Sequence, residues 1–573
     1  MNCVPDFLHI KYQPEYLHFI ENDMYRRTSP QLTLTEPAFA FPGILPDDDW
    51  SFVYKAKIWP FIDEKMFKHL YEEKGGAPNK SIKLKMSLLI FMALEELTWR
   101  EVEFMYMRRI DWINATHTDF GNAFIDHTTL FKFYQLLEQD DAAYKLFVDL
   151  TERFIDECGV SKKKQRVDSF FMLGWLATLS RYGLFKETIR VFLQTLRKHK
   201  PGLYYNIKDE LSLDYLRDHF DLTEKDKDKT RGRIKEMAND LYLLVSAFEN
   251  HTQVKHYETF NTLAQVFEQQ CVIKTGSDDD DSSGQEEVEI EIREKPEGDK
   301  IISSPHNTDA AYTRKRNKAV VGHKGFVTET CATENDVQFI TDVYLEAATH
   351  ADANEIGPIE ERLEDNDFKP ETLYGDAGFV NGASILESEA KGIDLAGPSS
   401  GRSQSFEGFA DCNRPLDIAD FQIEIHDETG ELSVLSCPKG QQPTDQARSK
   451  KTGKILVHFT SDACNTCPSC ERCPVKIGAR VTTLKVDEAQ YAGAARHHEY
   501  MGNTDYRKEC GTRAGAESLV NEIANSHDGR QARHRTEKGA RLQLLLAGIS
   551  CNVKRFIRFT QDRSAKNIVN AAI

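Results

Sequence analysis

The sequence lacks long apolar runs. Its longest apolar stretches, such as LLIFMAL at 88–94, are far shorter than the roughly 20 residues that a membrane-spanning helix needs. The first 20 residues also lack a basic start followed by an apolar block, so we expect no secretion signal. These absences predict a cytoplasmic protein without a membrane partner, in which the 12 cysteines stay reduced and a tight cluster of them indicates metal binding.

Positive charge is also scarce, with 73 Lys and Arg against 91 Asp and Glu and a net charge of −18. The acidic surplus is uneven: residues 278–299 hold eleven acidic residues and two basic ones, without an aromatic residue. This composition is typical of a solvated linker rather than a folded layer. Residues 507–572, by contrast, hold thirteen basic and six acidic residues, so the global charge hides a basic C-terminal region.

The N-terminal part reads as helical. Residues 81–97 are apolar almost all round, as expected of a buried helix, and Thr98 with Glu101 fits a capping box that starts a second helix at Trp99. A third helix is expected from His127. Consecutive short helices of this kind suit either a helix-turn-helix DNA reader or a common packing module.

Strand patterns follow. QRVDSFFML at 165–173 predicts a strand, AVVGHKGFVTETCA from 319 predicts a strand, a turn and a second strand, and ETLYGDAGFV predicts a strand that ends near Asp376. FQIEIHDETGELSVLSCP predicts a hairpin, and KILVHF at 454–459 predicts another strand. The sequence then predicts two further helices, at 513–525 and 538–559.

Three carboxylates stand out by their setting: Asp168 within a strand, Asp376 at a strand end, and Glu517 on a helix one turn after Arg513. Each has a plain explanation, as a strand-edge residue, a turn residue, and half of an i, i+4 ion pair. Converging carboxylates, however, are ligands that Mg²⁺ prefers, and two such ions support phosphodiester cleavage.

Taken in order, KQRVDS, LYGDAGFV and the R-x-x-x-E of RAGAESL resemble the three acidic motifs of insertion-sequence DDE transposases with an RNase H-like core. IDHTTLFKF resembles the end of the helical domain that precedes that core, and HNTDAAYTRKRNKAVVGHKGFVTET resembles its paired-strand segment. The related signature Tyr-x2-Arg-x3-Glu-x6-Lys is half kept, because Cys510 and Ala524 occupy its Tyr and Lys positions.

The resemblance implies an α/β fold, with an RNase H-like mixed-sheet catalytic core interrupted by helical and β-rich zinc-binding insertions, behind an all-α N-terminal domain. We expect a helical, DNA-binding domain (1–160), core parts at 161–274 (with a helical insertion), 301–395 and 506–573, an acidic linker (275–300) and a β-rich insertion with cysteines (396–505).

The implied function is that of a DNA transposase that binds the terminal inverted repeats of its element, cleaves phosphodiester bonds and joins the 3′ ends to target DNA. Asp168 would bridge two Mg²⁺ (or Mn²⁺) ions, Asp376 and Glu517 would each complete one site, and Arg513 would contact a phosphate or orient Glu517. The partners are double-stranded DNA and a second copy of the chain. The alternatives are an RNase H-like nuclease without strand transfer and a non-catalytic, zinc-containing DNA-binding protein.

The cysteines of CNTCPSCERC, with Cys437 upstream, carry the C-x2-C spacing of metal knuckles. Zn²⁺ in a structural role is the expectation; an iron–sulfur cluster and unligated thiols are the alternatives. The resemblance suggests Cys437, Cys464, Cys467 and Cys473 as ligands and leaves Cys470 spare, although five candidates for four places stay open.

Basic residues next to the predicted catalytic helix form a candidate DNA surface: Arg530, Arg533, Arg535 and Lys538. The plain alternative is a solvated helix face. The basic helix after Asp168, from Arg181 to Lys200, is a second candidate surface.

Overall fold

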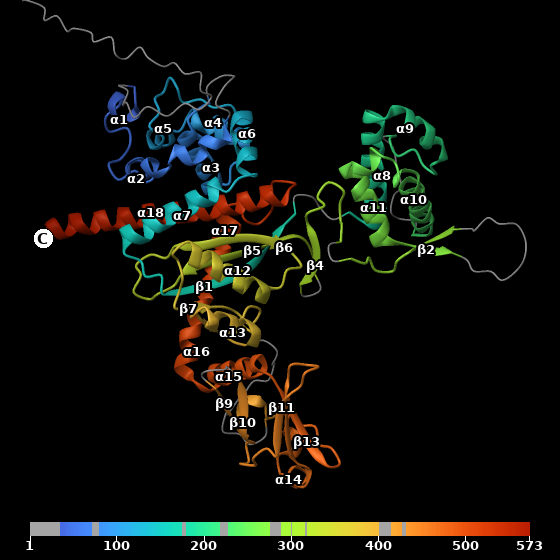
Figure 1. Cartoon of the computed structure of the whole chain (residues 1–573). Helices are drawn as coiled ribbons and strands as arrows, with labels where there is room; N and C mark the ends of the chain where they lie inside the picture. Colours follow the sequence, from blue (N-terminus) through green and yellow to red (C-terminus); the bar gives the residue numbers. More distant parts are fainter. Residues whose placement is uncertain are drawn as a thin grey trace, which may run out of the picture. The chain divides into compact units, whose positions relative to one another are not determined.

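The computed structural model describes residues 35–71, 79–174, 179–217, 227–275, 288–298, 301–315, 318–399, 414–426 and 431–572. The chain divides into two compact units, one of residues 1–92 with 97–142 and the other of residues 93–96 with 143–573 (Figure 1). In the described residues, no helix is both long enough and apolar enough to cross a membrane.

The first unit is helical, as the sequence predicts. Its buried centre is α3 (Ile82–Leu94), where Leu88, Leu89 and Ile90 are fully buried because the helix is apolar on every side. The other elements are α1 (Pro37–Ala40), α2 (Trp50–Lys57), α4 (Trp99–Tyr106), α5 (Ile110–Ala115), α6 (His127–Leu137) and the 3-10 turns η2 (Trp59–Phe61) and η3 (Glu64–Leu70).

The predicted capping box starts α4. The Thr98 side chain accepts a hydrogen bond from the Glu101 backbone N–H at 3.4 Å, and the Glu101 carboxylate accepts one from the Thr98 N–H at 2.7 Å. This reciprocal arrangement satisfies two of the donors that a helix start leaves without partners. The predicted helix at His127 is α6, and Asp126 is its N-cap.

The second unit is built on a mixed six-stranded sheet. Its strands run in the order β4-β5-β1-β7-β8, and β6 pairs with β5 beside β4. β1 is antiparallel to β5 and parallel to β7, while β7 is parallel to β8. The bounds are β1 (Lys164–Leu173), β4 (Ala311–Lys315), β5 (Lys318–Thr330), β6 (Ile340–Ala347), β7 (Thr372–Tyr374) and β8 (Asp394–Ala396).

One strand prediction is wrong. The segment from 319 was expected to turn, but it forms a single strand, β5, that continues through Gly322 and Gly325. A Cβ at Gly322 would lie 2.1 Å from the Met172 carbonyl oxygen, and one at Gly325 would lie 2.9 Å from the Phe170 ring. The glycines therefore allow β5 to pack closely on its neighbours instead of marking a turn.

Helices cover the sheet. α7 (Ala142–Cys158) and α18 (Glu537–Ala572) pack together through the stacked rings of Phe154 and Phe556, whose centroids are 4.2 Å apart. The side-chain amide of Asn552 on α18 bonds both backbone polar groups of Ile340 at the start of β6. The remaining helices of this region are α12 (Asp352–Asp365), α13 (Gly382–Ala390) and α17 (Gly515–Ser526).

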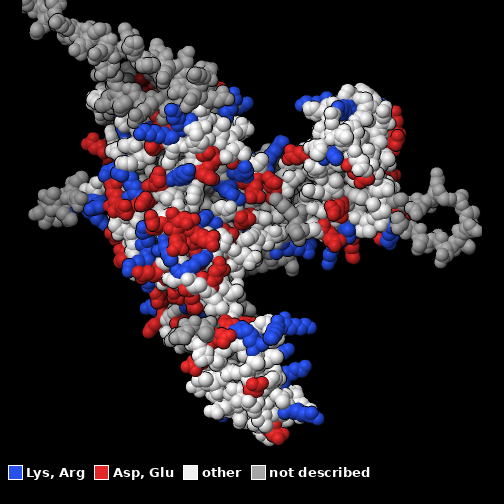
Figure 2. Space-filling view, in the orientation of Figure 1, with Lys and Arg blue, Asp and Glu red and all other residues white. Residues whose placement is uncertain are grey.

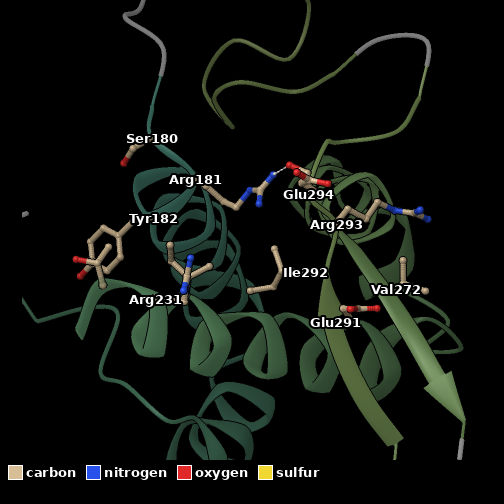
Figure 3. A pocket seen from close by; sticks show the side chains of 11 residues that line it. Ser180, Arg181, Tyr182, Arg231, Val272, Glu291, Ile292, Arg293 and Glu294 are labelled. Carbon is tan, nitrogen blue, oxygen red and sulfur yellow. Dashed lines mark hydrogen bonds between the residues drawn. The ribbon is translucent and has the colours of Figure 1, made fainter. Parts of the chain in front are cut away.

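A helical insertion with its own core follows β1. It comprises α8 (Arg181–His199), α9 (Pro201–Ile207), the turn η4 (Lys208–Glu210), α10 (Lys227–Phe248), the turn η5 (Val254–His256), α11 (Glu258–Gln270) and the hairpin of β2 (Cys271–Thr275) with β3 (Val288–Ile292). A cavity of about 980 Å³ lies between α8, α10 and the hairpin (Figure 3). Its charged lining mixes three arginines with two glutamates: Arg181, Arg231, Arg293, Glu291 and Glu294.

The predicted acidic linker is only partly testable, because its residues 276–287 lie outside the described residues. Within it, Val288–Ile292 form a strand, which an unfolded linker would not. The physical reason is the alternation in VEIEI, which buries Ile290 against the helical core and leaves the glutamates outside.

The cysteine-rich insertion forms two small sheets. The bounds are η6 (Ile418–Asp420), β9 (Gln422–Ile425), β10 (Leu432–Ser436), β11 (Asp445–Arg448), β12 (Ile455–Thr460), α14 (Ser461–Asn465), η7 (Cys470–Arg472) and β13 (Val481–Val486). β9 and β10 form the predicted antiparallel hairpin, and β11, β12 and β13 form a three-stranded sheet. The chain returns to the core region through α15 (Glu488–Gly502), α16 (Thr504–Cys510) and the turn η8 (Gly511–Ala514).

Candidate active site and cysteine cluster

Parallel pairing brings the two predicted aspartates to matching positions. The register of β1 and β7 pairs Arg166 with Tyr374, and each aspartate lies two residues further along its own chain segment. Asp168 is still within β1, whereas Asp376 follows the end of β7 and accepts a hydrogen bond from the Gly378 N–H at 2.7 Å. Both carboxylates therefore lie level with the carboxyl end of β7.

The turn η8 and helix α17 bring Arg513 and Glu517 to the same place. Arg166 on β1 donates to the Thr512 carbonyl at 2.9 Å. A Cβ at Gly515 would lie 1.9 Å from the Arg166 guanidinium, so only glycine lets the first residue of α17 come this close to the strand. Glu517, in the first turn of α17, is exposed, and Arg513 is half-buried.

The pKa of Asp168 reports how close these groups are. Burial is the largest cause of its rise from 3.8 to about 6, and the negative charges of Asp376 and Glu517 contribute to that rise. The Ser169 backbone N–H and the Arg513 guanidinium act in the opposite direction. The structure thus brings together all four residues that the sequence singled out.

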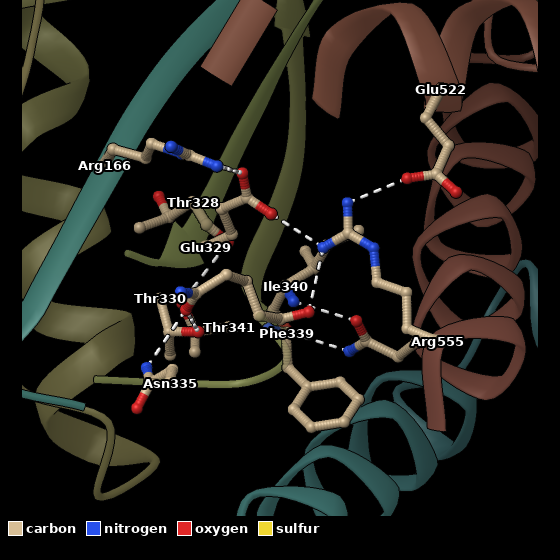
Figure 4. A network of polar contacts seen from close by, with 12 residues as sticks. Arg166, Thr328, Glu329, Thr330, Asn335, Phe339, Ile340, Thr341, Glu522 and Arg555 are labelled. Carbon is tan, nitrogen blue, oxygen red and sulfur yellow. Dashed lines mark hydrogen bonds and ion pairs between the residues drawn. The ribbon is translucent and has the colours of Figure 1, made fainter. Parts of the chain in front are cut away.

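A buried polar network fixes α17 on the sheet (Figure 4). Glu329 on β5 is 1% exposed and lies between two guanidiniums, 2.6 Å from that of Arg166 and 2.7 Å from that of Arg555. Arg555 on α18 also contacts Glu522 at 2.8 Å, and Lys554 approaches the other oxygen of that carboxylate at 3.1 Å. Since Glu522 belongs to α17, the network restrains the helix that carries Glu517.

The sequence did not single out two further charged residues beside Asp376. A Cβ at Gly378 would lie 2.9 Å from an oxygen of both Asp352 and Asp376, so the two carboxylates flank one glycine. Lys324 on β5 lies 3.2 Å from Asp352 and donates to the His350 carbonyl at 2.6 Å. An aspartate in the first turn of a helix is an ordinary pattern, which is why Asp352 carried no signal of a site.

The raised pKa of Asp168 predicts how the stability of the metal-free protein depends on pH. The folded chain holds this proton more tightly than the unfolded chain, so the free energy of unfolding should fall as pH rises from 3.8 to about 6 and stay lower above that range. Asp168→Asn, which cannot ionise, should lose this pH dependence. Urea unfolding of both proteins between about pH 4 and pH 8 checks it, and parallel profiles would contradict it.

Five cysteines line one cavity of about 260 Å³ in the β-rich insertion: Cys437, Cys464, Cys467, Cys470 and Cys473. The backbone N–H groups of Lys439 and Gln441 each donate to the Cys437 sulfur at 3.4 Å. The Val475 N–H donates to Cys473 in the same way. Hydrogen bonds from the backbone to sulfur stabilise a thiolate, which is the form that binds metal.

The thiols also interact electrostatically with one another. Burial is the largest cause of the rise in the pKa of Cys473 to about 11, and the sulfurs of Cys437, Cys464 and Cys467 contribute to that rise. Negative charge on several neighbouring sulfurs therefore needs a compensating cation, and a tetrahedral metal ion supplies one. The donor set fits Zn²⁺.

Three other groups of possible ligand atoms lie within 4.8 Å of one another in the described part of the chain: Glu522 with His527 and Cys551, Glu103 with Asp126 and His127, and Asp417 with Asp420 and His498. Carboxylates in them already pair with cations, as Glu522 does with Arg555 and Asp420 with Arg414. Neither the acidic residues at Asp168 nor the five cysteines are drawn together that tightly, so metal binding there would require their side chains to close in.

The predicted DNA contacts differ in how available they are. Arg530, Arg535 and Lys538 are exposed, whereas Arg533 is half-buried, lies 2.6 Å from Asp528 and donates to the Glu96 carbonyl. The segment adjoins the end of β1, where Leu173 pairs with Gln531. On α8, Arg190 pairs with Glu187, which leaves less of that helix to contact DNA.

Comparison with known protein families decides the relationship. Residues 48–136 match a transposase domain (DUF772), and residues 436–557 match a transposase DDE domain. These two matches support an insertion-sequence DDE transposase. The second match covers all five clustered cysteines, Arg513 and Glu517, whereas Asp168 and Asp376 lie outside both matches. No curated protein and no solved structure matches this chain.

Proposed function

We propose that this transposase binds the terminal inverted repeats of its element, cleaves phosphodiester bonds there and joins the freed 3′ ends to target DNA. The observation that carries the proposal is the convergence of Asp376, Glu517 and Arg513 on Asp168, with the pKa of Asp168 raised to about 6. Perturbed acidic groups of this kind concentrate at functional sites. Two family matches to transposase domains support the same reaction class.

The sheet supports an RNase H-like assignment for the catalytic core. Its central strand β1 has an antiparallel neighbour on one side and a parallel neighbour on the other, and the first acidic residue lies on this central strand. The second follows the parallel strand, and the third lies on a helix that packs on β1. Residues far apart in the sequence thereby come close together beside the carboxyl end of β7.

Asp168, Asp376 and Glu517 are the proposed ligands of Mg²⁺ or Mn²⁺. Hard carboxylate oxygens suit these ions, and a bound pair of them activates the attacking oxygen and stabilises the leaving one. Asp168 interacts electrostatically with both other acids and is the proposed bridging residue. Its raised pKa means that metal binding must displace a proton from a part of the molecules near neutral pH. Arg513 is placed to hold the glutamate or a DNA phosphate.

In the β-rich insertion, the proposed Zn²⁺ ligands are Cys437, Cys464, Cys467 and Cys473. Cys437, Cys464 and Cys473 pack against the core of the insertion, and the sulfurs of Cys437, Cys464 and Cys467 act on Cys473. The ion would hold this core together and take no part in the chemistry on DNA. DNA contacts by the N-terminal helices and by Arg530, Arg533, Arg535 and Lys538, and a dimer that holds two ends, complete the proposal.

A joined product tests the function. The native protein is incubated with a labelled duplex that carries the end of its element, a target plasmid and Mg²⁺, and the products are separated on a denaturing gel. Transposition predicts both nicked ends and end–target joints. Nicked ends without joints would indicate an RNase H-like nuclease. Binding of the duplex without any cleavage in Mg²⁺ or Mn²⁺ would indicate a DNA-binding protein that has lost catalysis.

A further inference from the structure

The β-rich insertion is rich in positively charged residues, although the chain as a whole is acidic. Residues 436–486 contain nine Lys and Arg against three Asp and Glu, in a chain whose net charge is −18. Figure 2 shows Lys and Arg side chains gathered along one edge of this insertion, with few acidic ones among them. Six of its exposed cations are called the basic face here: Lys439, Lys450, Lys451, Lys476, Arg480 and Lys485.

These six have no carboxylate partner among the described residues. In the same insertion, Arg448 and Lys454 do pair, with Glu488 and with Asp487. Other cations of the insertion therefore form ion pairs, whereas those of the basic face do not.

The local fold fixes where these cations lie. β13 alternates, with Leu484 and Val486 buried and Lys485 outside, so one face of the three-stranded sheet packs on the core and the other stays open. Lys476 pairs with Thr483 through two backbone hydrogen bonds, which extends the open face by one more segment. Arg480 directly precedes β13.

The turn between β11 and β12 supplies two more of these cations, Lys450 and Lys451. The Ser449 N–H donates to the Lys454 carbonyl at 2.8 Å and the Gly453 N–H donates to the Ser449 carbonyl at 2.8 Å, which closes a tight turn. Gly453 has φ +70°, a conformation that favours glycine. Lys450 and Lys451 are held exposed at its tip.

We infer that the basic face is a docking surface for the phosphate backbone of double-stranded DNA. Like charges without carboxylate partners, gathered in one small insertion, repel one another, and a polyanion relieves that repulsion. Duplex DNA presents one negative charge per roughly 1.7 Å of its axis, so several cations can be matched at once. The inference rests on the proposed function, since that function makes DNA the partner, and it adds a contact that neither family match assigns.

Neutralising three members of the basic face tests it: Lys476→Gln, Arg480→Gln and Lys485→Gln together. Binding of a labelled duplex by the full chain is followed by fluorescence anisotropy between about 50 and 200 mM salt. The triple variant should bind at least about tenfold more weakly at the low-salt end, and the slope of log K against log salt should become shallower by about 2 to 3.

A matched control removes equal charge elsewhere: Lys163→Gln, Lys235→Gln and Lys274→Gln. These lysines are equally exposed but paired, with Glu371, Glu289 and Glu291. The control should keep the native slope. A triple variant with the native slope, or a control that loses as much, overturns the inference.

A second variant protects the test against misfolding, because Lys485 lies within a strand. Lys450→Gln with Lys451→Gln changes only the tip of the turn and should make the slope shallower by about 1 to 2. Native-like salt dependence in this variant also counts against the basic face. The proposed function fails separately, if the native protein does not cleave its element ends.

Discussion

Replacing Asp376 with asparagine is expected to lower cleavage and joining of element ends by on the order of a thousandfold, with duplex binding retained. The substitution keeps the size of the side chain and its ability to accept the Gly378 N–H, which bonds Asp376 at 2.7 Å. It removes the charge that the proposed metal ion needs. The reaction should therefore fail at the chemical step and not at folding.

The measurement compares single-turnover cleavage of a labelled end duplex by the two proteins, together with their melting temperatures. Glu371→Gln is the matched control, because Glu371 directly precedes β7, is exposed, and pairs with Lys163 at 2.8 Å. It removes one charge from the same strand region and should react like the native protein. If Asp376→Asn also reacts at the native rate, Asp376 merely shapes a turn and the catalytic assignment falls.

Local features of the fold were predictable where local chemistry decides them. The capping box of Thr98 and Glu101 needs only the residues at the helix start, and the alternation around Asp168 needs only one strand. The continuous strand β5 was missed because Gly322 and Gly325 are there for contacts with Met172 and Phe170, about 150 residues away in sequence. A glycine required by a distant neighbour looks, in sequence, like a glycine required by a turn.

The candidate site shows the same division. The resemblance of three short motifs to those of DDE transposases was enough to single out Asp168, Asp376 and Glu517. It could not show that they meet, which depends on the parallel register of β1 with β7. Asp352 could not be found, since its place beside Asp376 follows from how α12 packs over Gly378. The network around Glu329 also joins residues whose partners are far away in the chain.

The cysteine cluster gives the second large expected effect. Purified native protein should contain about one zinc per chain, and Cys464→Ser should lose it together with the fold of residues 414–502. The reason is that the buried core here is small: Val434, Val457, Phe459 and Leu484 are its central members. A structural zinc contributes about 10 kcal/mol or more of apparent folding free energy, which such a core cannot replace.

Hydrogen exchange checks this effect, because it separates the β-rich insertion from the rest of the molecule. Backbone amides of β12 and β13 should lose protection in Cys464→Ser, while those of β1 and β5 should keep it.

Cys470→Ser is the matched control: it removes a thiol from the same cavity, and it should keep both zinc and protection if the other four cysteines are the ligands. Loss of zinc in Cys470→Ser would instead place Cys470 among the ligands. Visible absorption from bound iron in the native protein would replace the zinc assignment with an iron–sulfur cluster, and full protection of a metal-free native insertion would show that its apolar core suffices alone.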